Sequence, residues 1–371
     1  MKAVLDYPPL MPGIRTNRPQ EPAPKADVEV RFLDPSVDSA WDQLVLSHPE
    51  ATFFHSSAWA RTLANTYGHK PFYLSFSSCR APLALVPMME VSSAFTGRRG
   101  VGLPFSDFCS PLLFQKGDNS FVLSKLSALA SEHAWKHFEL RDPRSLELAI
   151  DPAIQYFGHS LDLRQGPDAL FAGCASPVRR AIRKAEKSKL SVQVSQGLQS
   201  VRDFYDLHVQ TRRRHGLPPQ PLSFFRNLFE EAIRTGLGFV VQATLEKRCV
   251  AAAIFFRFGR TALYKYGASD PAAHDLRANN LVMWEAIRFL ARSACDSLHF
   301  GRTSLTDPGL RRFKLGWGAA EEVISYARWN TVSGQWAAGT DRLKGAHNML
   351  FANMHPAFNR LAGALLYPHL D

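Results

Sequence analysis

Cations and glycines gather between residues 301 and 318. The cations are Arg302, Arg311, Arg312 and Lys314, and the glycines are Gly301, Gly309, Gly316 and Gly318. Glycine lets the backbone approach a ligand closely, and arginine or lysine neutralises a phosphate or carboxylate. We therefore predict a basic, glycine-rich turn that holds an anion, with Arg302 and Arg312 positioning it. A solvated basic loop without a ligand is the alternative.

A second group of cations repeats at helical spacing within residues 177–188. They are Arg180, Arg183, Lys184 and Lys187. Like charges at this spacing repel one another by roughly 0.2–0.5 kcal/mol per pair, so helix stability alone does not explain the stripe. A polyanion such as tRNA, a nucleotide diphosphate or a pyrophosphoryl lipid would offset the repulsion. A solvated helix face, partly neutralised by Glu186, is the alternative.

Hydrophobic periodicity indicates the elements that must position these cations. It predicts a strand over 262–268, a helix with one apolar face over 275–292, and a strand over 297–301. α/β folds build sites for anionic ligands from this order of elements. Tyr264 and Tyr266 alternate along the first strand, so we expect their side chains on the same side of the sheet. There they would contact a peptide or sugar, or else pack in the core.

The composition favours a globular protein of two domains. The chain has 371 residues, of which 46% are hydrophobic, and its formal net charge is +11. This length suits two cores, and the charge favours an acidic partner. The five cysteines are scattered and lack zinc-site spacing, so we expect no metal and a reduced, cytoplasmic setting. We expect neither a secretory signal nor a transmembrane helix.

The chain divides into four predicted segments. Residues 1–26 form a flexible lead with six prolines, 27–165 and 166–330 form two α/β domains, and 331–371 form a helical tail. In the tail, apolar residues line one helix face before Pro356 and another after it. The residues after Pro356 are Phe358, Leu361, Leu365 and Leu366. We expect this tail to pack on the core or, alternatively, to dock peripherally at the inner membrane surface.

Each domain has its own predicted order of elements. In the first, we predict strands at 28–33, 71–77, 82–91, 98–103, 136–141 and 154–163, and helices at 39–47, 57–67 and 122–133. In the second, we predict helices at 177–188, 201–215 and 223–235, then strands at 238–244, 249–258 and 262–268. Ser176 is the expected N-cap of the first of these helices. The helix 275–292 and strands at 297–301 and 322–329 complete the domain.

Four strings in the second domain resemble a known family. They are YKYGAS at 264–269, LRANNLVMWEAI at 276–287, FGRTS at 300–304 and GLRRFKLGWGA at 309–319. They are similar to the FemAB-related branch of the GNAT-like acyltransferases, which includes the Fem peptidoglycan aminoacyltransferases and relatives encoded beside exopolysaccharide and PEP-CTERM genes. The resemblance covers residues 28–330 and implies two tandem GNAT-like domains.

The resemblance also implies where acyl transfer takes place. Lys314 matches a lysine of the family's transfer site, where its charge would stabilise developing negative charge. Asp107 ends a Leu-Pro-Phe-Ser-Asp string similar to a family element, although Phe108-Cys109 departs from the family's Tyr-Gly. The Asp107 carboxylate would orient the acceptor amine or accept its proton, and Trp317 would wall the channel.

The same resemblance points to the start of the helix 275–292 as a donor site. Arg277 and Asn280 would meet a phosphate of the donor there. The stretch 276–280, however, lacks the glycine-rich pyrophosphate loop of acetyl-CoA enzymes.

Three functions are open at this point. The first is direct N-acyl transfer from acyl-CoA to an amine of a cell-envelope or exopolysaccharide precursor, which would be a glycan or a peptide. The second uses aminoacyl-tRNA as donor and a peptidoglycan-type precursor as acceptor, and the basic helix and the charge motivate it. The third is a catalytically degenerate scaffold, suggested by the departures at Cys109 and 276–280.

Overall fold

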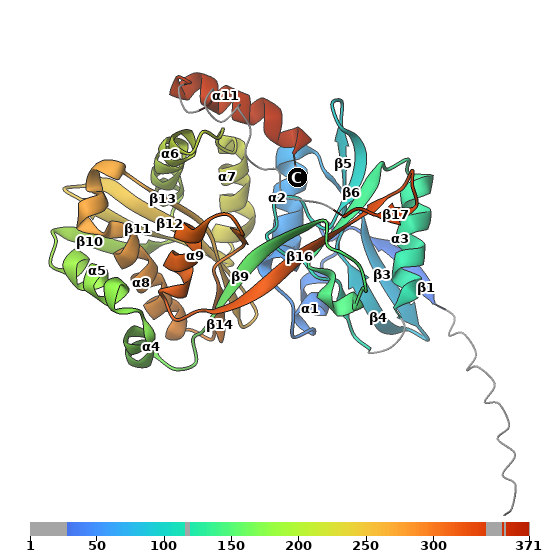
Figure 1. Cartoon of the computed structure of the whole chain (residues 1–371), viewed down its shortest axis with the longest axis horizontal. Coiled ribbons are helices and arrows are strands. Elements are labelled where there is room, and N and C mark those ends of the chain that lie inside the picture. Colours follow the sequence, from blue (N-terminus) through green and yellow to red (C-terminus); the bar gives the residue numbers. More distant parts are fainter. Residues whose placement is uncertain (1–27, 116–118, 339–350, 352–353, 371) are drawn as a thin grey trace, which may run out of the picture.

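The computed structural model describes residues 28–115, 119–338, 351 and 354–370. Figure 1 shows two α/β lobes side by side, joined by long central strands, with a C-terminal helix across the top. The predicted lead 1–26 and most of the apolar face predicted before Pro356 lie outside the described residues.

The first half (residues 29–162) contains nine strands and three α-helices among its described residues. The strands are β1 Glu29–Leu33, β2 Lys70–Pro71, β3 Tyr73–Ser78, β4 Ala81–Val86, β5 Met89–Ser93, β6 Gly97–Val101, β7 Leu112–Leu113, β8 His137–Arg141 and β9 Ile154–Asp162. The helices are α1 Trp41–Leu46, α2 Ser57–Tyr67 and α3 Ser120–Glu132, with 3-10 turns η1 Phe53–His55 and η2 Pro143–Leu146. The single strand predicted at 82–91 is wrong, because β4 and β5 belong to different sheets. Pro87, which has no N–H to donate, separates them.

The second half (residues 167–330) contains the predicted helices and strands in the predicted order, and it adds α4, β10, β15 and α9, which were not predicted. Its helices are α4 Pro167–Gly173, α5 Ser176–Glu186, α6 Leu198–Arg214, α7 Leu222–Leu228, the π-helix η3 Phe229–Ile233, the 3-10 turn η4 Pro271–Leu276, α8 Ala278–Ala291 and α9 Pro308–Leu315. Its strands are β10 Leu190–Ser195, β11 Gly238–Leu245, β12 Arg248–Phe258, β13 Thr261–Ser269, β14 Ser297–His299, β15 Thr303–Ser304 and β16 Ala320–Asn330, followed by β17 Gln335–Trp336. Ala175, not Ser176, is the N-cap of α5.

The glycine-rich turn predicted at 309–318 is wrong, because most of it is helix α9. The Asp307 side chain accepts a hydrogen bond from the Leu310 N–H at 2.9 Å, and Pro308 occupies the first turn. A side-chain cap followed by proline is a strong start for a helix, and here it outweighs the helix-weakening effect of Gly309. The helix places Arg312 and Lys314 on different faces, so only Lys314 is buried.

One long sheet passes through both halves. Its strand order is β10-β11-β12-β13-β14-β9-β16-β8-β6-β5-β2, while β1-β3-β4-β7 form a separate sheet. Strand β9 from the first half pairs with β14, and β16 from the end of the second half pairs with β8. Figure 1 shows β9 and β16 as the two long strands that cross between the lobes. The domain boundary at 165/166 stays a prediction from sequence. Each half contributes a strand that pairs with strands of the other half.

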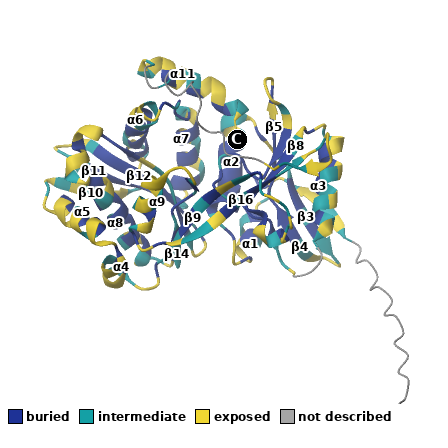
Figure 2. Ribbon diagram, in the orientation of Figure 1, coloured by how far each residue is buried: buried dark blue, intermediate teal, exposed yellow. Residues whose placement is uncertain are grey.

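The halves also share a hydrophobic core. Phe53 of η1 stacks on Phe256 of β12, with ring centroids 4.0 Å apart. The same cluster of buried residues contains Trp59 of α2 and Phe224 of α7. In Figure 2, α2 and α7 show extensive buried surface, whereas the outer helices α5 and α11 expose one face. The packing therefore fixes how the first half faces the second.

The C-terminal helix α11 Pro356–Leu366 and the turn η5 Tyr367–His369 connect the two lobes. Arg212 of α6 donates to the Tyr367 hydroxyl at 2.9 Å, and Arg99 of β6 donates to the His369 carbonyl at 2.9 Å. The opposite face of α11 is open, with Phe358 66% exposed and Leu365 63% exposed. Within the described ranges, no helix is both long enough and apolar enough to cross a bilayer.

Candidate active site

A β-bulge in β13 organises the junction between the halves. In the register with β12, Tyr264 pairs with Phe255 and Tyr266 pairs with Ile254, which leaves Lys265 as an extra residue. An extra residue breaks the alternation of side chains, so Tyr264 and Tyr266 point to opposite faces. The predicted same-side tyrosine pair is therefore wrong. Tyr264 packs against the cluster under α8, and Tyr266 packs against the core shared by both halves.

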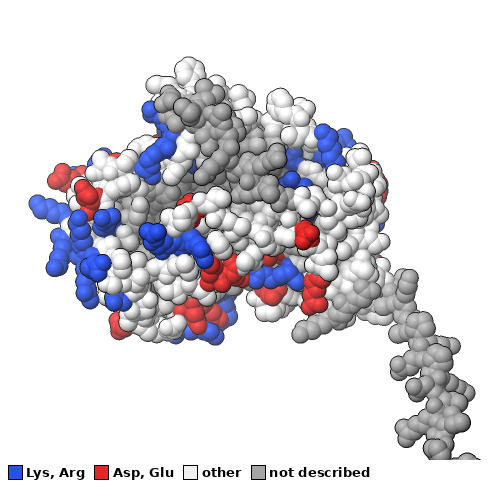
Figure 3. Space-filling view, in the orientation of Figure 1, with Lys and Arg blue, Asp and Glu red and all other residues white. Residues whose placement is uncertain are grey.

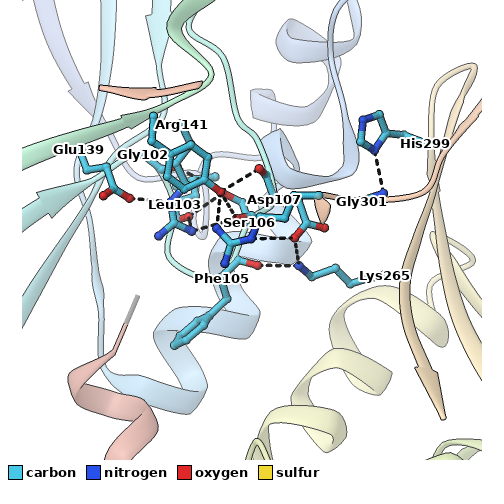
Figure 4. A network of polar contacts seen from close by, with 12 residues as sticks. Gly102, Leu103, Phe105, Ser106, Asp107, Glu139, Arg141, Lys265, His299 and Gly301 are labelled. Atoms are coloured by element: carbon cyan, nitrogen blue, oxygen red, sulfur yellow. Dashed lines mark hydrogen bonds and ion pairs between the residues drawn. The ribbon is translucent and has the colours of Figure 1, made fainter. Parts of the chain in front are cut away.

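The bulge directs Lys265 at a loop of the first half. Its Nζ donates to the Phe105 carbonyl at 2.8 Å and to Asp107 Oδ1 at 3.0 Å (Figure 4). The ammonium also lies 5.1 Å from the centroid of the Phe54 ring. Sequence reasoning missed Lys265, although a lysine inside the otherwise apolar strand Ala262–Ala268 is a usable signal, since a buried lysine needs a partner.

Asp107, a predicted catalytic residue, lies in a cationic environment. Besides Lys265, the Arg302 Nε lies 3.8 Å from Asp107 Oδ1. Burial alone would raise the pKa of Asp107, but the charges of Lys265, Arg302 and Lys314 together lower it. The carboxylate is therefore ionised at neutral pH, and it can accept hydrogen bonds from an incoming amine.

The loop that carries Asp107 is held in a strained conformation. Leu103 and Phe105 have φ of 61° and 59°, in the left-handed region that bulky residues rarely adopt. Arg141 donates to the carbonyls of Leu103 at 3.0 Å and Ser106 at 2.9 Å, and the Tyr326 hydroxyl donates to the Asp107 carbonyl at 2.8 Å. Figure 4 shows this network around the loop. Such strain persists only where neighbours impose it, so the position of Asp107 is preorganised.

Two other predicted residues complete this centre. Arg302 donates to the Tyr326 hydroxyl at 2.6 Å, and its guanidinium lies over the Tyr156 ring. The Nζ of Lys314 donates to the carbonyls of Gly301 at 2.8 Å and Arg302 at 3.0 Å. An ammonium has three donors, so one N–H of Lys314 remains for a ligand. Burial lowers the pKa of Lys314 to about 8, against the opposing charge of Asp107.

The strands β13 and β14 part next to this centre. They pair in parallel only from Thr261 to Leu263. Among the described residues, no strand pairs with β13 on that side beyond Leu263. Gly301 lies two residues after the end of β14. A Cβ atom added at Gly301 would lie 2.8 Å from Asp107 Oδ2 and 3.4 Å from the Tyr264 carbonyl oxygen. Asp107 thus borders the gap between the parted strands.

A cavity of about 270 Å³ opens from this gap beneath α8. Its walls include Tyr264, Gly267 and Phe313. A second cavity of about 180 Å³ lies at the N-terminus of α8, and Arg277 and Asn280 are among the residues that line it. Ser269 and Asn279 line both cavities, and Asn279 Nδ2 donates to Ser269 Oγ at 3.0 Å. An elongated ligand can therefore reach from a helix N-terminus, which favours anions, to the parted strands.

The remaining predicted residues lie away from the centre. Arg180, Arg183 and Lys184 lie on the exposed face of α5, and Figure 3 shows lysines and arginines concentrated over that end of the second half. Arg312 is exposed on α9 and lines a groove beside α5. Trp317 is buried in the core under α8, where it packs against Phe313 rather than lining either cavity.

Comparisons with known proteins bear on the fold. Residues 174–321 match the sequence model of the acetyltransferase (GNAT) domain. No curated protein matches the sequence. The structure is similar to that of FemX, with a TM-score of 0.63 and 14% identity over 80% of this chain and 96% of that one.

Two further solved structures have similar folds. A tandem GNAT protein from the clavulanic acid biosynthesis pathway has a TM-score of 0.53 and 10% identity, and the match covers 82% of this chain and 99% of that one. L-PGS from Bacillus licheniformis has a TM-score of 0.50 and 11% identity, with 85% and 96% of the two chains covered. The expected fold of two tandem GNAT-like halves with a C-terminal helix is confirmed.

Proposed function

We propose that this protein is an N-acyltransferase that moves an acyl group directly from an anionic donor to an amine of a cell-envelope or exopolysaccharide precursor. The observation that carries the proposal is the Asp107–Lys265 pair at the gap between β13 and β14. This arrangement brings a carboxylate and several cations to the place where a GNAT-type fold presents its donor.

Acyl-CoA is the donor that fits the second half best. Its pyrophosphate would lie at the N-terminus of α8 against Arg277, which adopts φ of 58° and lines the cavity there. Its pantetheine arm would follow the parted edge of β13, where free backbone groups can hydrogen-bond an amide-rich chain. The thioester would then lie beside Tyr264 and Gly267.

The centre can promote transfer without a covalent enzyme intermediate. The amine nitrogen attacks the thioester carbonyl carbon, the C–N bond forms and the C–S bond breaks. The proton lost by the amine neutralises the departing thiolate. Asp107 would orient the neutral amine by accepting its N–H, and the free N–H of Lys314 would stabilise the oxyanion. Arg302 would hold an anionic group of either substrate.

Aminoacyl-tRNA is a second candidate donor, and one observation favours it. The exposed basic face of α5 with Arg180, Arg183 and Lys184 could follow a phosphate backbone. The donor cavities and the Asp107 centre would serve an ester in the same way as a thioester. The acceptor would then be a peptidoglycan-type precursor.

Peripheral contact with the inner membrane is a further part of the proposal. The open face of α11 exposes Phe358, Leu361 and Leu365 at helical spacing. Apolar residues on such a face can enter the interfacial layer of a bilayer, where lipid-linked precursors are found.

A donor-binding screen tests the proposal. Melting of the full chain is followed with acetyl-CoA, longer acyl-CoAs, and charged or uncharged tRNA at two salt concentrations. A ligand at 100 times its Kd should stabilise the native state by about 2.7 kcal/mol. Stabilisation by acyl-CoA, lost on Arg277→Ala, supports the first donor, and salt-sensitive stabilisation by aminoacyl-tRNA alone supports the second. If no donor stabilises the protein and none supports transfer, the proposal is wrong.

A further inference from the structure

A separate cavity of about 290 Å³ lies between the two halves. We call it the acidic cavity. One side of its lining comes from the strands β13, β14 and β9. The other side comes from η1 and from two segments of the first half at residues 108–110 and 142–144. Residues 261 and 263 line it together with Ser297 and His299, which pair with them across β13 and β14. None of these residues lines the two donor cavities.

The acidic cavity adjoins the Asp107 centre through one thin wall. The Phe108 and His299 rings form this wall, with centroids 4.2 Å apart. Gly301 touches both sides, because its N–H donates to His299 Nδ1 at 2.9 Å and its α-carbon faces the Asp107 carboxylate. Figure 4 shows His299 and Asp107 on either side of Gly301.

The charge of the cavity is opposite to that of the centre. Three carboxylates, Glu50, Asp142 and Glu322, line it beside a single guanidinium. That guanidinium, Arg144, bridges Glu322 at 2.7 Å and Asp142 at 2.7 Å. The lining is therefore net negative in a protein whose net charge is +11. A cationic ligand is favoured here, whereas anionic groups are favoured beside Lys265 and Arg302.

The lining also offers hydrogen bonds suited to hydroxyl groups. Because the Gly301 N–H donates to Nδ1, we assign the proton of the His299 ring to Nε2. This Nε2 is buried and lies 3.4 Å from Glu322 Oε1, so it faces the carboxylate side of the cavity. Ser160 and Ser297 add hydroxyls that can donate or accept, and the Thr261 hydroxyl, which donates to the Phe258 carbonyl, can accept. Phe53 and Phe108 supply apolar walls.

We infer that the acidic cavity binds a small primary amine that carries several hydroxyl groups, of the size of one amino-sugar ring. Its volume is at the lower end of small-molecule sites and suits one such ring. The carboxylates would hold the ammonium, and the remaining groups would hold the hydroxyls. The role of this ligand as acyl acceptor rests on the proposed function, but its binding does not.

The reversal of charge across the wall suits an acceptor. In the acidic cavity, carboxylates favour the ammonium form of the amine and so capture it at neutral pH. Beside Asp107, the cations Lys265, Arg302 and Lys314 disfavour a further positive charge and so favour loss of its proton. The neutral amine is the nucleophile, so capture and activation would take place in adjacent environments.

Direct binding to the full chain without a donor tests the inference. The ligands are glucosamine, glucose, N-acetylglucosamine and cyclohexylamine, and calorimetry gives their Kd values. We expect glucosamine to bind more tightly than the two neutral sugars and than the amine without hydroxyls. Equal binding of glucose, or no binding of any amine in the panel, would overturn the inference.

Glu321 provides a matched control for Glu322. It is adjacent on β16 but faces the other side of the sheet, where Arg311 and His159 contact it. Glu322→Gln should weaken glucosamine binding by about tenfold, the usual effect of losing one charged hydrogen bond. Glu321→Gln should leave the Kd within about twofold. Ser297→Phe, which fills the cavity from β14, should abolish binding without removing a charge.

Two failures are distinguishable. If glucosamine binds as expected but no donor supports transfer, the cavity stands and the proposed acyltransferase function fails. If amines are acylated and Glu322→Gln and Ser297→Phe leave the acceptor KM equal to that of Glu321→Gln, the function stands and the acceptor role of the cavity fails.

Discussion

Asp107 of the first half and Lys265 of the second half form an ion pair at 3.0 Å in which both side chains are largely buried. Each residue depends on a local irregularity of the backbone. A β-bulge releases Lys265 from the strand alternation, and a strained loop presents Asp107. The pair therefore joins the halves at the place where we locate the chemistry.

Removing one member of this pair should destabilise the protein strongly. Lys265→Met leaves a buried carboxylate with weaker compensation, at a cost of about 3–5 kcal/mol. Asp107→Asn in the same background should restore part of that loss, because the uncompensated charge is gone. Urea unfolding of the two single variants and the double variant measures this coupling. Additive effects of the two substitutions would contradict a direct interaction.

Asp107→Asn alone should slow catalysis in the molecules that remain folded. An asparagine cannot accept a proton and accepts hydrogen bonds less strongly, so kcat should fall by about 100-fold or more. Asp206→Asn serves as the control, since Asp206 is an exposed acid on α6 paired with Arg360. Once an acceptor is identified, single-turnover acylation gives the rates. Equal rates in the two variants would exclude Asp107 from the reaction.

Gly301→Ala should disrupt the centre by steric contact. Gly301 has φ of +71°, and a Cβ would lie 2.8 Å from Asp107 Oδ2. Gly334 has φ of +63° with nothing within 4 Å, so Gly334→Ala carries the backbone strain without the contact. Both should lose about 1–2 kcal/mol of stability from the left-handed conformation. Only Gly301→Ala should also lower kcat, and a similar loss in both variants would mean that strain alone matters.

Lys314 should make the free energy of unfolding increase as the pH rises from about 8 to 10.5. Burial lowers its pKa from 10.5 to about 8 in the folded protein. The unfolded chain therefore binds more protons between these values, and stability rises with pH across this window. Below pH 8 the cost of the buried ammonium is fully present, at most about 3 kcal/mol. Lys314→Met should remove this rise, as measured by urea unfolding from pH 7 to 10.5.

Substitutions on the basic face of α5 should distinguish acyl-CoA from aminoacyl-tRNA as the donor. The triple variant Arg180→Ala, Arg183→Ala and Lys184→Ala removes three exposed cations, none of which lines a donor cavity. With acyl-CoA as donor, its KM should change by less than about twofold, because surface charges are screened. With aminoacyl-tRNA, affinity should fall steeply and the salt dependence should weaken. Binding measured at two salt concentrations distinguishes these outcomes.

Much of the fold could be predicted from the sequence. Periodicity, caps and glycine stops located most helices and strands of both halves, because these signals are local. The helix α9 was not predicted, because Gly309 and Gly316 are typical of a turn, although Asp307 and Pro308 are a strong helix start. The strand exchange of β9 and β16 could not be predicted, since pairing between distant segments leaves no local pattern.

Part of the site could be predicted from the sequence, because some of its residues lie in recognisable local motifs. The structure brings Asp107, Arg302 and Lys314 together, and Arg277 and Asn280 line the cavity at the N-terminus of α8. Lys265 was missed because a bulge is not visible in a period-two pattern, and the same bulge invalidated the same-side placement of Tyr264 and Tyr266. The acidic cavity is built from segments far apart in the sequence, and this arrangement appears only in the folded chain.

The exchange of strands between the halves has a consequence for how the protein is made. Within the described structure, β9 pairs only with β14, β15 and β16, all of which follow residue 296. On the ribosome, β9 must therefore wait on the order of ten seconds for its first partner. During that time the nascent chain presents a strand of mixed apolar and polar residues with both edges unpaired, a template for aggregation. We expect folding during translation to need a chaperone for this interval. The segment 174–321 does not include β9, and we expect it to be insoluble when it is expressed alone.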